Sequence, residues 1–373
     1  MKKIVFLVSE DWYFCSHRLN LAIEAINSGF SVYLLANINN ERKLIENCGI
    51  KIIPLKYLKR SRINIFGEFI SLLEIYIKIN KIKPNILHSV ALKPVIYGSL
   101  STLFSNNVKN INALGGLGFI FSSGNLKARI LRPIVLKLLK FICNRKKNIL
   151  ILQNLDDYKF VYNKLKINQK NISLIKGAGV DCNKFKESKN NNEIPIILLA
   201  SRMIWDKGIK EFYNAAKLIK KKGIKAKFVL VGKPDPENPN SISLKQLNIW
   251  NNSGVIEWWG YRSDMVGVFK DVDIVALPTF YGEGIPKVLI EGMACSKPIV
   301  ATDMPGCRDL VIDGSNGILV KPKDFFDLAK SLEKLILDPG LCKKMGAKGR
   351  ALAVKNYCQE KIFSKIINLY SDE

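Results

Sequence analysis

Two glutamates, Glu283 and Glu291, lie in the segment GEGIPKVLIEGMA with seven residues between them. The first lies in a glycine-flanked bend and the second in an apolar run. Pro286 suits the first turn of a helix, so we expect a helix to begin near Ile285 and to turn its free backbone N–H groups toward the bend. Such a helix end attracts phosphate, and the two carboxylates suit sugar hydroxyls, which donate hydrogen bonds to them. The plain alternative for Glu291 is an ion pair with Lys287, four residues earlier.

Two cations follow another apolar run, IILLA, which ends at Ala200. Arg202 is the second residue after this run, and Lys207 follows five residues later beside Gly208. On a strand-to-helix turn, both could hold a diphosphate, Arg through paired hydrogen bonds and Lys as a point charge. At about 4 Å and an effective dielectric constant of about 20, each charge pair is worth roughly 4 kcal/mol. The alternative is a solvated basic turn that pairs with Asp206.

The positive charge is concentrated in the first half of the chain. Of the net charge of +26 over 373 residues, residues 1–190 carry +20, from 31 Lys and Arg against 11 Asp and Glu. Residues 191–373 carry +6, from 27 against 21. Such a basic half suggests a polyanionic partner: a membrane surface, a lipid-linked phosphate or a nucleic acid.

The eight cysteines are scattered without any C-x-x-C spacing. We therefore expect neither a zinc site nor a disulfide framework, and a reducing compartment. The first residues, MKKIVFLVSEDWY, hold too short an apolar stretch for a signal peptide and predict a buried strand. No stretch approaches the roughly 20 apolar residues of a spanning helix.

Two segments, 63–83 and 126–147, mix apolar and basic residues in a way that could suit a membrane surface. The alternative is that each helix packs on a sheet while its lysine stems cover apolar surface. In the second segment, Pro133 predicts a break or a helix start.

Short β-branched runs separated by helix-length segments recur along the whole chain, which predicts an α/β protein with two doubly wound parallel sheets. The predicted strands are 4–8, 32–36, 85–90, 149–153, 194–200, 226–232, 254–260, 272–278 and 297–302. The polar stretch ESKNNNEIP separates the two series. We expect a first domain over 1–186, a second over 187–355, and a last helix within 356–373 that packs back on the first domain.

The order of the motifs resembles retaining glycosyltransferase family 4. The second half carries R-x4-K, then GYRSD (260–264), then E-x7-E and PGCRDLVIDGSNGILV. KGAGVDCNKF (176–185) fits near the domain junction, while the first half matches more loosely through GLGFIF (116–121) and QNLDDYKF (153–160). Within the family, the chain resembles the PglA/CapM-like bacterial enzymes that build lipid-linked oligosaccharides.

This resemblance implies a GT-B fold, in which two Rossmann-like domains face a central cleft and the second binds a nucleotide-sugar donor, usually UDP-linked. The implied catalytic residues are Arg202 and Lys207, which would neutralise the diphosphate, and Glu283, which would hold the sugar. Glu291 would accept hydrogen bonds from the ribose. The other implied donor-binding residues are Gly284, Ile285, Pro286 and Lys287 at the helix start, and Tyr261 and Arg262 near the base.

The acceptor side departs from the family pattern. Many relatives have a histidine just before the GLG-like segment, where this chain has Gly115. We expect His17, Arg18 and Gly116 to lie on the acceptor side. His88, inside a predicted strand, is expected to be a core residue.

No metal or other cofactor is expected. Asp271-Val-Asp273 imitates the D-x-D metal site of another glycosyltransferase fold, but Asp271 should end a helix and Asp273 should open a strand.

The resemblance implies a retaining transfer of an N-acetylhexosamine, with GalNAc favoured, from a UDP-sugar to a polyprenyl-diphosphate-linked sugar. The basic first domain would face the inner side of the cytoplasmic membrane, as a peripheral protein of the cytoplasm. One alternative is a UDP-sugar 2-epimerase on the same fold. Another is a nucleic-acid-binding protein, although the sequence has no known nucleic-acid-reading module.

Overall fold

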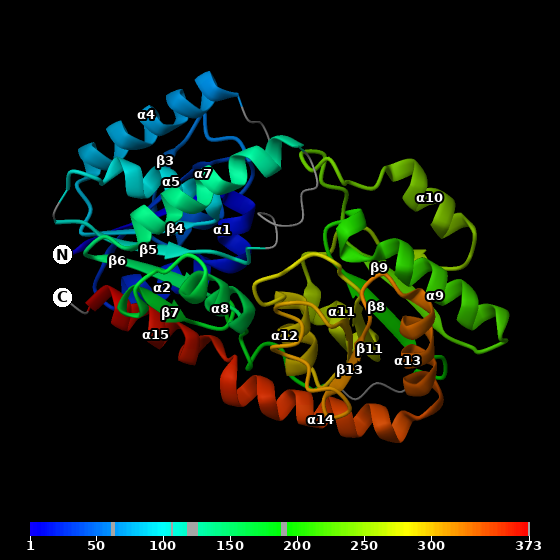
Figure 1. Ribbon diagram of the computed structural model, residues 1–373. Helices are drawn as coiled ribbons and strands as arrows, with labels where there is room; N and C mark the ends of the chain where they lie inside the picture. The colour runs from blue at the N-terminus through cyan, green and yellow to red at the C-terminus, as the bar shows by residue number, and fades with distance from the viewer. Residues whose placement is uncertain (61–63, 106, 118–125, 188–191, 372–373) are drawn as a thin grey trace. The chain divides into compact units, whose positions relative to one another are not determined.

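The chain forms two compact units, one of which is made from two separate stretches of sequence (Figure 1). Unit 1 is Met1–Ala178 with Ile362–Glu373, and unit 2 is Gly179–Lys361. The division falls at 178/179 and 361/362, where the sequence suggested 186/187 and 355/356. The structure is a computed structural model, and it describes residues 1–60, 64–105, 107–117, 126–187 and 192–371. Residues 118–121 of the GLGFIF motif and 188–191 of the polar stretch lie outside the described residues.

Unit 1 contains a seven-stranded parallel sheet in the order β3-β2-β1-β4-β5-β6-β7. The strands are β1 (Lys3–Glu10), β2 (Ser31–Asn37), β3 (Lys51–Pro54), β4 (Ile86–Val90), β5 (Lys109–Ala113), β6 (Asn148–Leu152) and β7 (Ile172–Leu174). The helices are α1 (Asp11–His17), α2 (Leu19–Asn27), α3 (Arg42–Asn47), α4 (Ile65–Ile82), α5 (Leu92–Ser101), α7 (Leu126–Cys143), α8 (Leu155–Asn163) and α15 (Gln359–Ser371), with a 3₁₀ turn at Gln169–Asn171.

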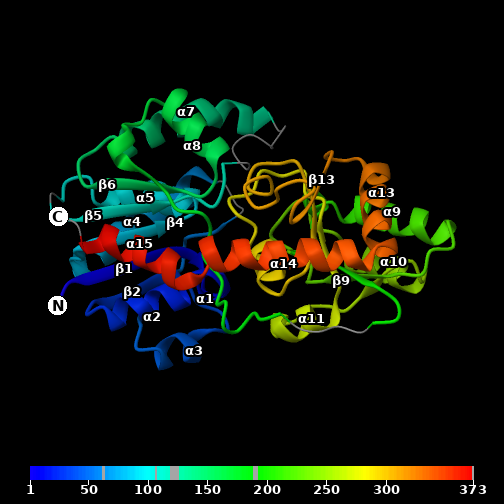
Figure 2. The same ribbon diagram turned by 90° about the horizontal axis from the view of Figure 1, so that it is seen from below.

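Helices cover both faces of this sheet. Figure 1 shows α4, α5 and α7 on one face and α2 on the other, and Figure 2 shows α15 lying across the strands on the α2 side. Successive side chains of β1 pack alternately on the two faces of the sheet. Phe6 packs with α2 and α15, whereas Val5 and Leu7 pack with α4. A parallel strand buried on both faces needs this near-continuous apolar run, which is why the sequence pattern revealed it.

His88 of β4 is fully buried, so the prediction of a core position is confirmed. Its ring stacks on Phe6 with centroids 5.0 Å apart, and its Nδ1 hydrogen-bonds the hydroxyl of Tyr370 in α15. Burial, with a smaller contribution from Arg18, holds the pKa of His88 well below its ordinary value of 6.5. The last helix is thus fastened in the unit 1 core through a neutral histidine.

Unit 2 contains a six-stranded parallel sheet in the order β10-β9-β8-β11-β12-β13. The strands are β8 (Ile196–Ala200), β9 (Lys227–Val231), β10 (Glu257–Trp258), β11 (Ile274–Leu277), β12 (Ile299–Thr302) and β13 (Gly317–Val320). The helices are α9 (Ile209–Lys221), α10 (Leu244–Asn252), α11 (Met265–Asp271), α12 (Lys287–Ala294), α13 (Phe325–Leu337) and α14 (Pro339–Asn356), with a 3₁₀ turn, η2, at Trp205–Lys207.

Four strands were missing from the prediction. β3, β7 and β13 are only three or four residues long, and β5 reads KNINA, with two asparagines. Asn110 and Asn112 are nevertheless buried, and Thr102 and Ser99 donate hydrogen bonds to their side-chain oxygens at 3.0 and 3.2 Å. A polar strand of this kind leaves no apolar signal.

The prediction of a break or a helix start at Pro133 is wrong, because Pro133 lies inside α7. A proline frees the carbonyl four residues earlier, here that of Arg129. Both residues are exposed, so water can satisfy that carbonyl and the helix continues. In the part of the chain that the structure describes, no helix is long and apolar enough to cross a bilayer.

The cysteine spacing predicted no disulfide framework, but one disulfide is present and joins Cys182 to Cys358. The two cysteines are 176 residues apart in sequence, and their Cα atoms are 5.6 Å apart. The backbone N–H of Val180 donates to Tyr357, and that of Gln359 donates to Val180, both at 2.9 Å. These bonds align two distant segments, which a search for local cysteine spacing cannot detect.

We predict that air-exposed protein, denatured without reductant, reacts with six equivalents of a thiol reagent, since six cysteines are free. Reduction should raise the count to eight. The Cys358→Ser variant should give seven without reduction, because Cys182 then has no partner. Eight thiols in the unreduced wild type would show that the bond does not form.

Candidate functional site

Most of the candidate residues lie at the carboxyl edge of the unit 2 sheet. Arg202 follows β8, and Glu283 lies on the loop after β11, the strand that pairs with β8. Tyr261 and Arg262 follow β10, at the far side of β9, and both are exposed. Loops at this edge of a doubly wound sheet are where such folds bind ligands.

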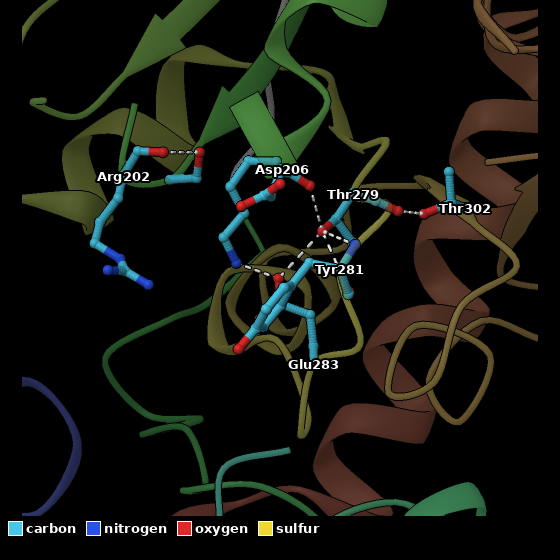
Figure 3. Close-up of polar contacts among 8 residues, drawn as sticks. Arg202, Asp206, Thr279, Tyr281, Glu283 and Thr302 are labelled. Carbon is cyan, nitrogen blue, oxygen red and sulfur yellow. Dashed lines mark hydrogen bonds and ion pairs between the residues drawn. The ribbon is translucent and has the colours of Figure 1, made fainter. Parts of the chain in front are cut away.

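Lys207 and Glu283 form an ion pair between two of these loops (Figure 3). Their side chains are only 14% and 15% exposed, so each charge relies on the other in a poorly solvated place. The hydroxyl of Thr279 lies 3.0 Å from the Asp206 carbonyl and 3.4 Å from the Glu283 carboxylate. Thr302 at the end of β12 donates to the Thr279 carbonyl. The network therefore ties together the ends of β8, β11 and β12.

Gly208 explains how the Lys207 turn approaches β11 so closely. A Cβ at this position would lie 2.0 Å from the Pro278 carbonyl oxygen, and its φ is +74°. Only glycine meets both demands without strain.

Arg202 pairs with Asp235 on the loop after β9, with Nη1 and Oδ2 2.5 Å apart. The alternative reading, in which the basic turn pairs with Asp206, is wrong: the Asp206 carboxylate accepts a hydrogen bond from Asn240 at 2.9 Å. Asp235 is 33 residues from Arg202 and lies in no recognised motif, so sequence reasoning missed it. Thr279 and Thr302 were missed for the same reason.

The helix α12 begins at Lys287, two residues later than predicted, because Pro286 has an extended ψ of 116° and acts as its N-cap. The bend before it is supported by the PGCRD segment. A Cβ on Gly306 would lie 2.0 Å from the Gly284 carbonyl oxygen, and the Glu283 N–H donates to Pro305 at 3.3 Å. Ile285 is 7% exposed and anchors the bend in the core.

Glu291 forms the predicted ion pair with Lys287, at 3.2 Å. It is also only 5% exposed, which is unusual for a helix carboxylate. Burial raises the pKa of Glu291 above its ordinary value of 4.5, and nearby Lys287 and Lys184 oppose the rise. A ligand that donates hydrogen bonds to the carboxylate would favour its charged form.

In unit 1, His17 lies near Gly115 through Tyr13, whereas Arg18 is buried in the core. His17 stacks on Tyr13, with ring centroids 4.4 Å apart. The Tyr13 hydroxyl lies 3.7 Å from where a Cβ on Gly115 would be, and Gly116 follows with φ +111°. Arg18 is only 4% exposed and lies near His88 in the core.

Asp271 and Asp273 occupy the predicted positions, at the end of α11 and immediately before β11. Asp273 accepts a hydrogen bond from the Ile196 N–H at 2.8 Å, which is a structural role. Among the residues that the structure describes, no group of three His, Cys, Asp or Glu side chains could hold a metal ion.

Two family models match the chain: Glycosyl transferase 4-like over residues 3–154, and Glycosyl transferases group 1 over residues 181–352. The chain is 29% identical over 352 residues to the N,N'-diacetylbacillosaminyl-diphospho-undecaprenol alpha-1,3-N-acetylgalactosaminyltransferase of Campylobacter jejuni, covering 91% of this chain and 90% of the relative. It is 25% identical over 348 residues to the capsular polysaccharide biosynthesis glycosyltransferase CapM of Staphylococcus aureus, covering 91% of this chain and 89% of the relative.

The fold resembles the crystal structure of HepE from Anabaena in complex with UDP and glucose, with a TM-score of 0.79 and 16% identity over the full length of both chains. Both units are Rossmann-like parallel-sheet domains of the GT-B type. With both halves matched by glycosyltransferase models, the chain belongs to the family 4-type glycosyltransferases and is an enzyme of that class.

Proposed function

We propose that this enzyme moves an N-acetylhexosamine, with GalNAc favoured, from a UDP-sugar to a sugar linked to polyprenyl diphosphate, with retention of the anomeric configuration. The names of the Campylobacter and Staphylococcus relatives support the acceptor class and the setting of glycan assembly. HepE was crystallised with UDP and glucose, which supports a UDP-linked donor. Membership of a transferase family disfavours the epimerase alternative.

The observation that carries the proposal is the cluster of Arg202, Lys207 and Glu283 beside the start of α12. In this proposal the two cations bind the diphosphate, and the backbone N–H groups at the start of α12 add donors. Glu283 accepts hydrogen bonds from the sugar, and Glu291 from the ribose. Tyr261 and Arg262 contact the base. The proposal includes no metal: Arg202 and Lys207 contact the diphosphate oxygens directly.

The transfer itself would be a same-face substitution. The acceptor hydroxyl oxygen forms a bond to the sugar C1 as the bond from C1 to the diphosphate oxygen breaks. The departing oxygen takes the hydroxyl proton, so no carboxylate has to become covalently bound. Catalysis then consists mainly of stabilising charge on the leaving diphosphate. His17 and Gly116 remain the acceptor-side candidates in unit 1, whereas the burial of Arg18 argues against a direct role.

We predict that Arg202→Ala and Lys207→Ala each lower kcat by about 100- to 1,000-fold, the usual loss when one donor to a developing oxyanion is removed. Sugar transfer would be measured with UDP-GalNAc and a polyprenyl-diphosphate disaccharide acceptor, in EDTA.

Lys210→Ala is the matched control, because Lys210 is exposed and only three residues from Lys207. Thermal melting shows whether each variant is folded. A folded Arg202→Ala enzyme with wild-type turnover would refute the assigned role.

We predict that UDP binding releases protons, through Glu291. The free protein holds the pKa of Glu291 above 4.5, and ribose hydroxyls that donate to the carboxylate would lower it. UDP affinity should therefore rise with pH through the window between the two pKa values and level off above it. Calorimetry in two buffers of different ionisation heat measures the release.

Glu291→Gln should abolish the proton release and weaken UDP binding by roughly 10- to 100-fold, as expected for lost hydrogen bonds to a charged group. A wild type that binds UDP without releasing protons would contradict the assignment.

Unit 1 also presents a surface that we propose contacts the inner face of the cytoplasmic membrane. On α4 the exposed apolar side chains recur at helical spacing along one face, and Figure 1 shows α4 on the outer side of the sheet. These residues are Phe66, Phe69, Leu73, Tyr76 and Ile77, between 46% and 72% exposed.

Both acids of α4 are turned toward the protein. Glu68 pairs with Lys93 at 2.6 Å, and Glu74 pairs with Lys78 at 2.6 Å. Their side chains are 20% and 10% exposed, so the outward face of α4 carries little negative charge. An apolar face without acids, in a half of the chain with a net charge of +20, is complementary to an anionic bilayer.

The helix α7 adds cations to this side of the sheet. Its inner face packs in the core through Leu139, Ile142 and Cys143. Its outer face exposes Ile134 and Phe141, and a groove of about 470 Å³ is lined by Lys137, Lys140, Phe141, Asn144 and Arg145. One face of this segment therefore packs in the core, and we propose that the other contacts lipid.

We predict that the triple variant Phe69→Gln, Leu73→Gln, Ile77→Gln loses most of its binding to vesicles that contain phosphatidylglycerol. Each buried apolar side chain contributes roughly 1.5 to 3 kcal/mol when fully removed from water. Sedimentation with anionic and with zwitterionic vesicles measures the fraction of protein that is bound.

Leu244→Gln with Ile249→Gln is the control, because these residues are exposed on α10 of unit 2 by 57% and 52%. Equal binding of the triple variant and the control would eliminate α4 as the contact.

A further inference from the structure

The loop after β9, residues 232–243, runs alongside the turn that carries Arg202. Three backbone hydrogen bonds of 2.9 to 3.0 Å join the two segments. They run from the N–H of Met203 to Lys233, from Ile242 to Met203 and from Trp205 to Asn240. The Asn240 side chain also donates to the Asp206 carboxylate at 2.9 Å. The 232–243 loop is thus a fixed support for the turn.

Asp235 projects from this support onto Arg202. The residue is 8% exposed, and its Oδ2 lies 2.5 Å from the Arg202 Nη1. Its backbone is held at both ends: the N–H donates to the Ser241 hydroxyl at 3.0 Å, and the carbonyl accepts from Asn238 at 2.8 Å. The loop therefore sets the position of the carboxylate, and Arg202, with 42% of its side chain exposed, adjusts to it.

This contact occupies one terminal nitrogen of a planar group that has five N–H donors. The opposite edge of the guanidinium can still bind two phosphate oxygens in parallel. An arginine that is already held in one orientation loses less freedom when it binds an anion. The carboxylate charge would repel a bound diphosphate, but Asp235 is buried against Arg202, whereas Arg202 is partly exposed.

We propose that Asp235 is a positioning residue that holds the Arg202 guanidinium in the orientation that meets the donor diphosphate. It acts through Arg202 and does not touch the substrate. The inference rests on the proposed function of Arg202 in diphosphate binding. It assigns the 232–243 loop a task beyond connecting β9 to α10.

The test compares Asp235→Asn and Asp235→Ala with Glu237→Gln, an exposed acid on the same loop. Asn keeps an oxygen that can accept from Arg202, whereas Ala removes it. We expect Asp235→Ala to lower kcat/KM by about 10- to 100-fold, the usual effect of losing a hydrogen bond to a charged group. Asp235→Asn should lower kcat/KM less, mostly through kcat. The kcat/KM of Glu237→Gln should stay within about twofold of the wild type.

The same substitutions in an Arg202→Ala background show whether Asp235 acts through the arginine. We expect Asp235→Asn to change kcat/KM by less than about twofold there. A full further loss in that background would mean a purely structural role. Tighter UDP binding by a folded Asp235→Asn protein would mean that Asp235 restrains Arg202 from the donor. Either outcome overturns the proposal.

Calorimetry with UDP separates this inference from the proposed function. If the wild type does not bind UDP, or if Arg202→Ala binds it equally well, the proposed donor site fails. If Arg202→Ala binds weakly while Asp235→Ala, shown by melting to be folded, matches the wild type in binding and turnover, only the positioning role fails.

Discussion

The ion pair between Lys207 and Glu283 is the contact on which the proposed donor site of unit 2 depends. It joins loops that leave β8 and β11, and Thr279 hydrogen-bonds to both of them. A lone ammonium group in a place this poorly solvated would be costly, and a carboxylate offsets that cost. If Lys207 binds diphosphate as proposed, the folded protein therefore holds this cation in place before the diphosphate arrives.

The same arrangement recurs at the two other cations, Arg202 with Asp235 and Lys287 with Glu291. Each positive charge has its own carboxylate, so the three pairs together are close to neutral. Donor affinity then cannot come from a simple excess of positive charge. It must come from directed hydrogen bonds, from the N–H groups at the start of α12, and from the second edge of Arg202.

The sequence was sufficient to place Arg202 and Glu283 at one edge of a sheet, because each follows a recognisable buried strand. It was not sufficient to identify their partners. Asp235 follows β9 and Thr302 ends β12, and only the order β9-β8-β11-β12 brings those strand ends beside Arg202 and Thr279. An alternating pattern of strands and helices leaves that order open. The bond between Cys182 and Cys358 could not be predicted for the same reason, because it joins distant segments. The composition of α4 could not show which of its apolar residues face outward.

Glu291 raises the question of why a carboxylate is buried beside the helix end that we propose binds phosphate. Because burial raises its pKa, the folded chain binds a proton more tightly than the unfolded chain does. Its contribution to stability is therefore greatest at low pH and is lost as the pH rises through the folded-state pKa. Above the folded-state pKa the charged residue opposes folding, and the ion pair with Lys287 offsets this only in part. Hydrogen-bond donors from a bound ribose would favour the charged form, so the residue that is unfavourable in the empty protein becomes favourable in the complex.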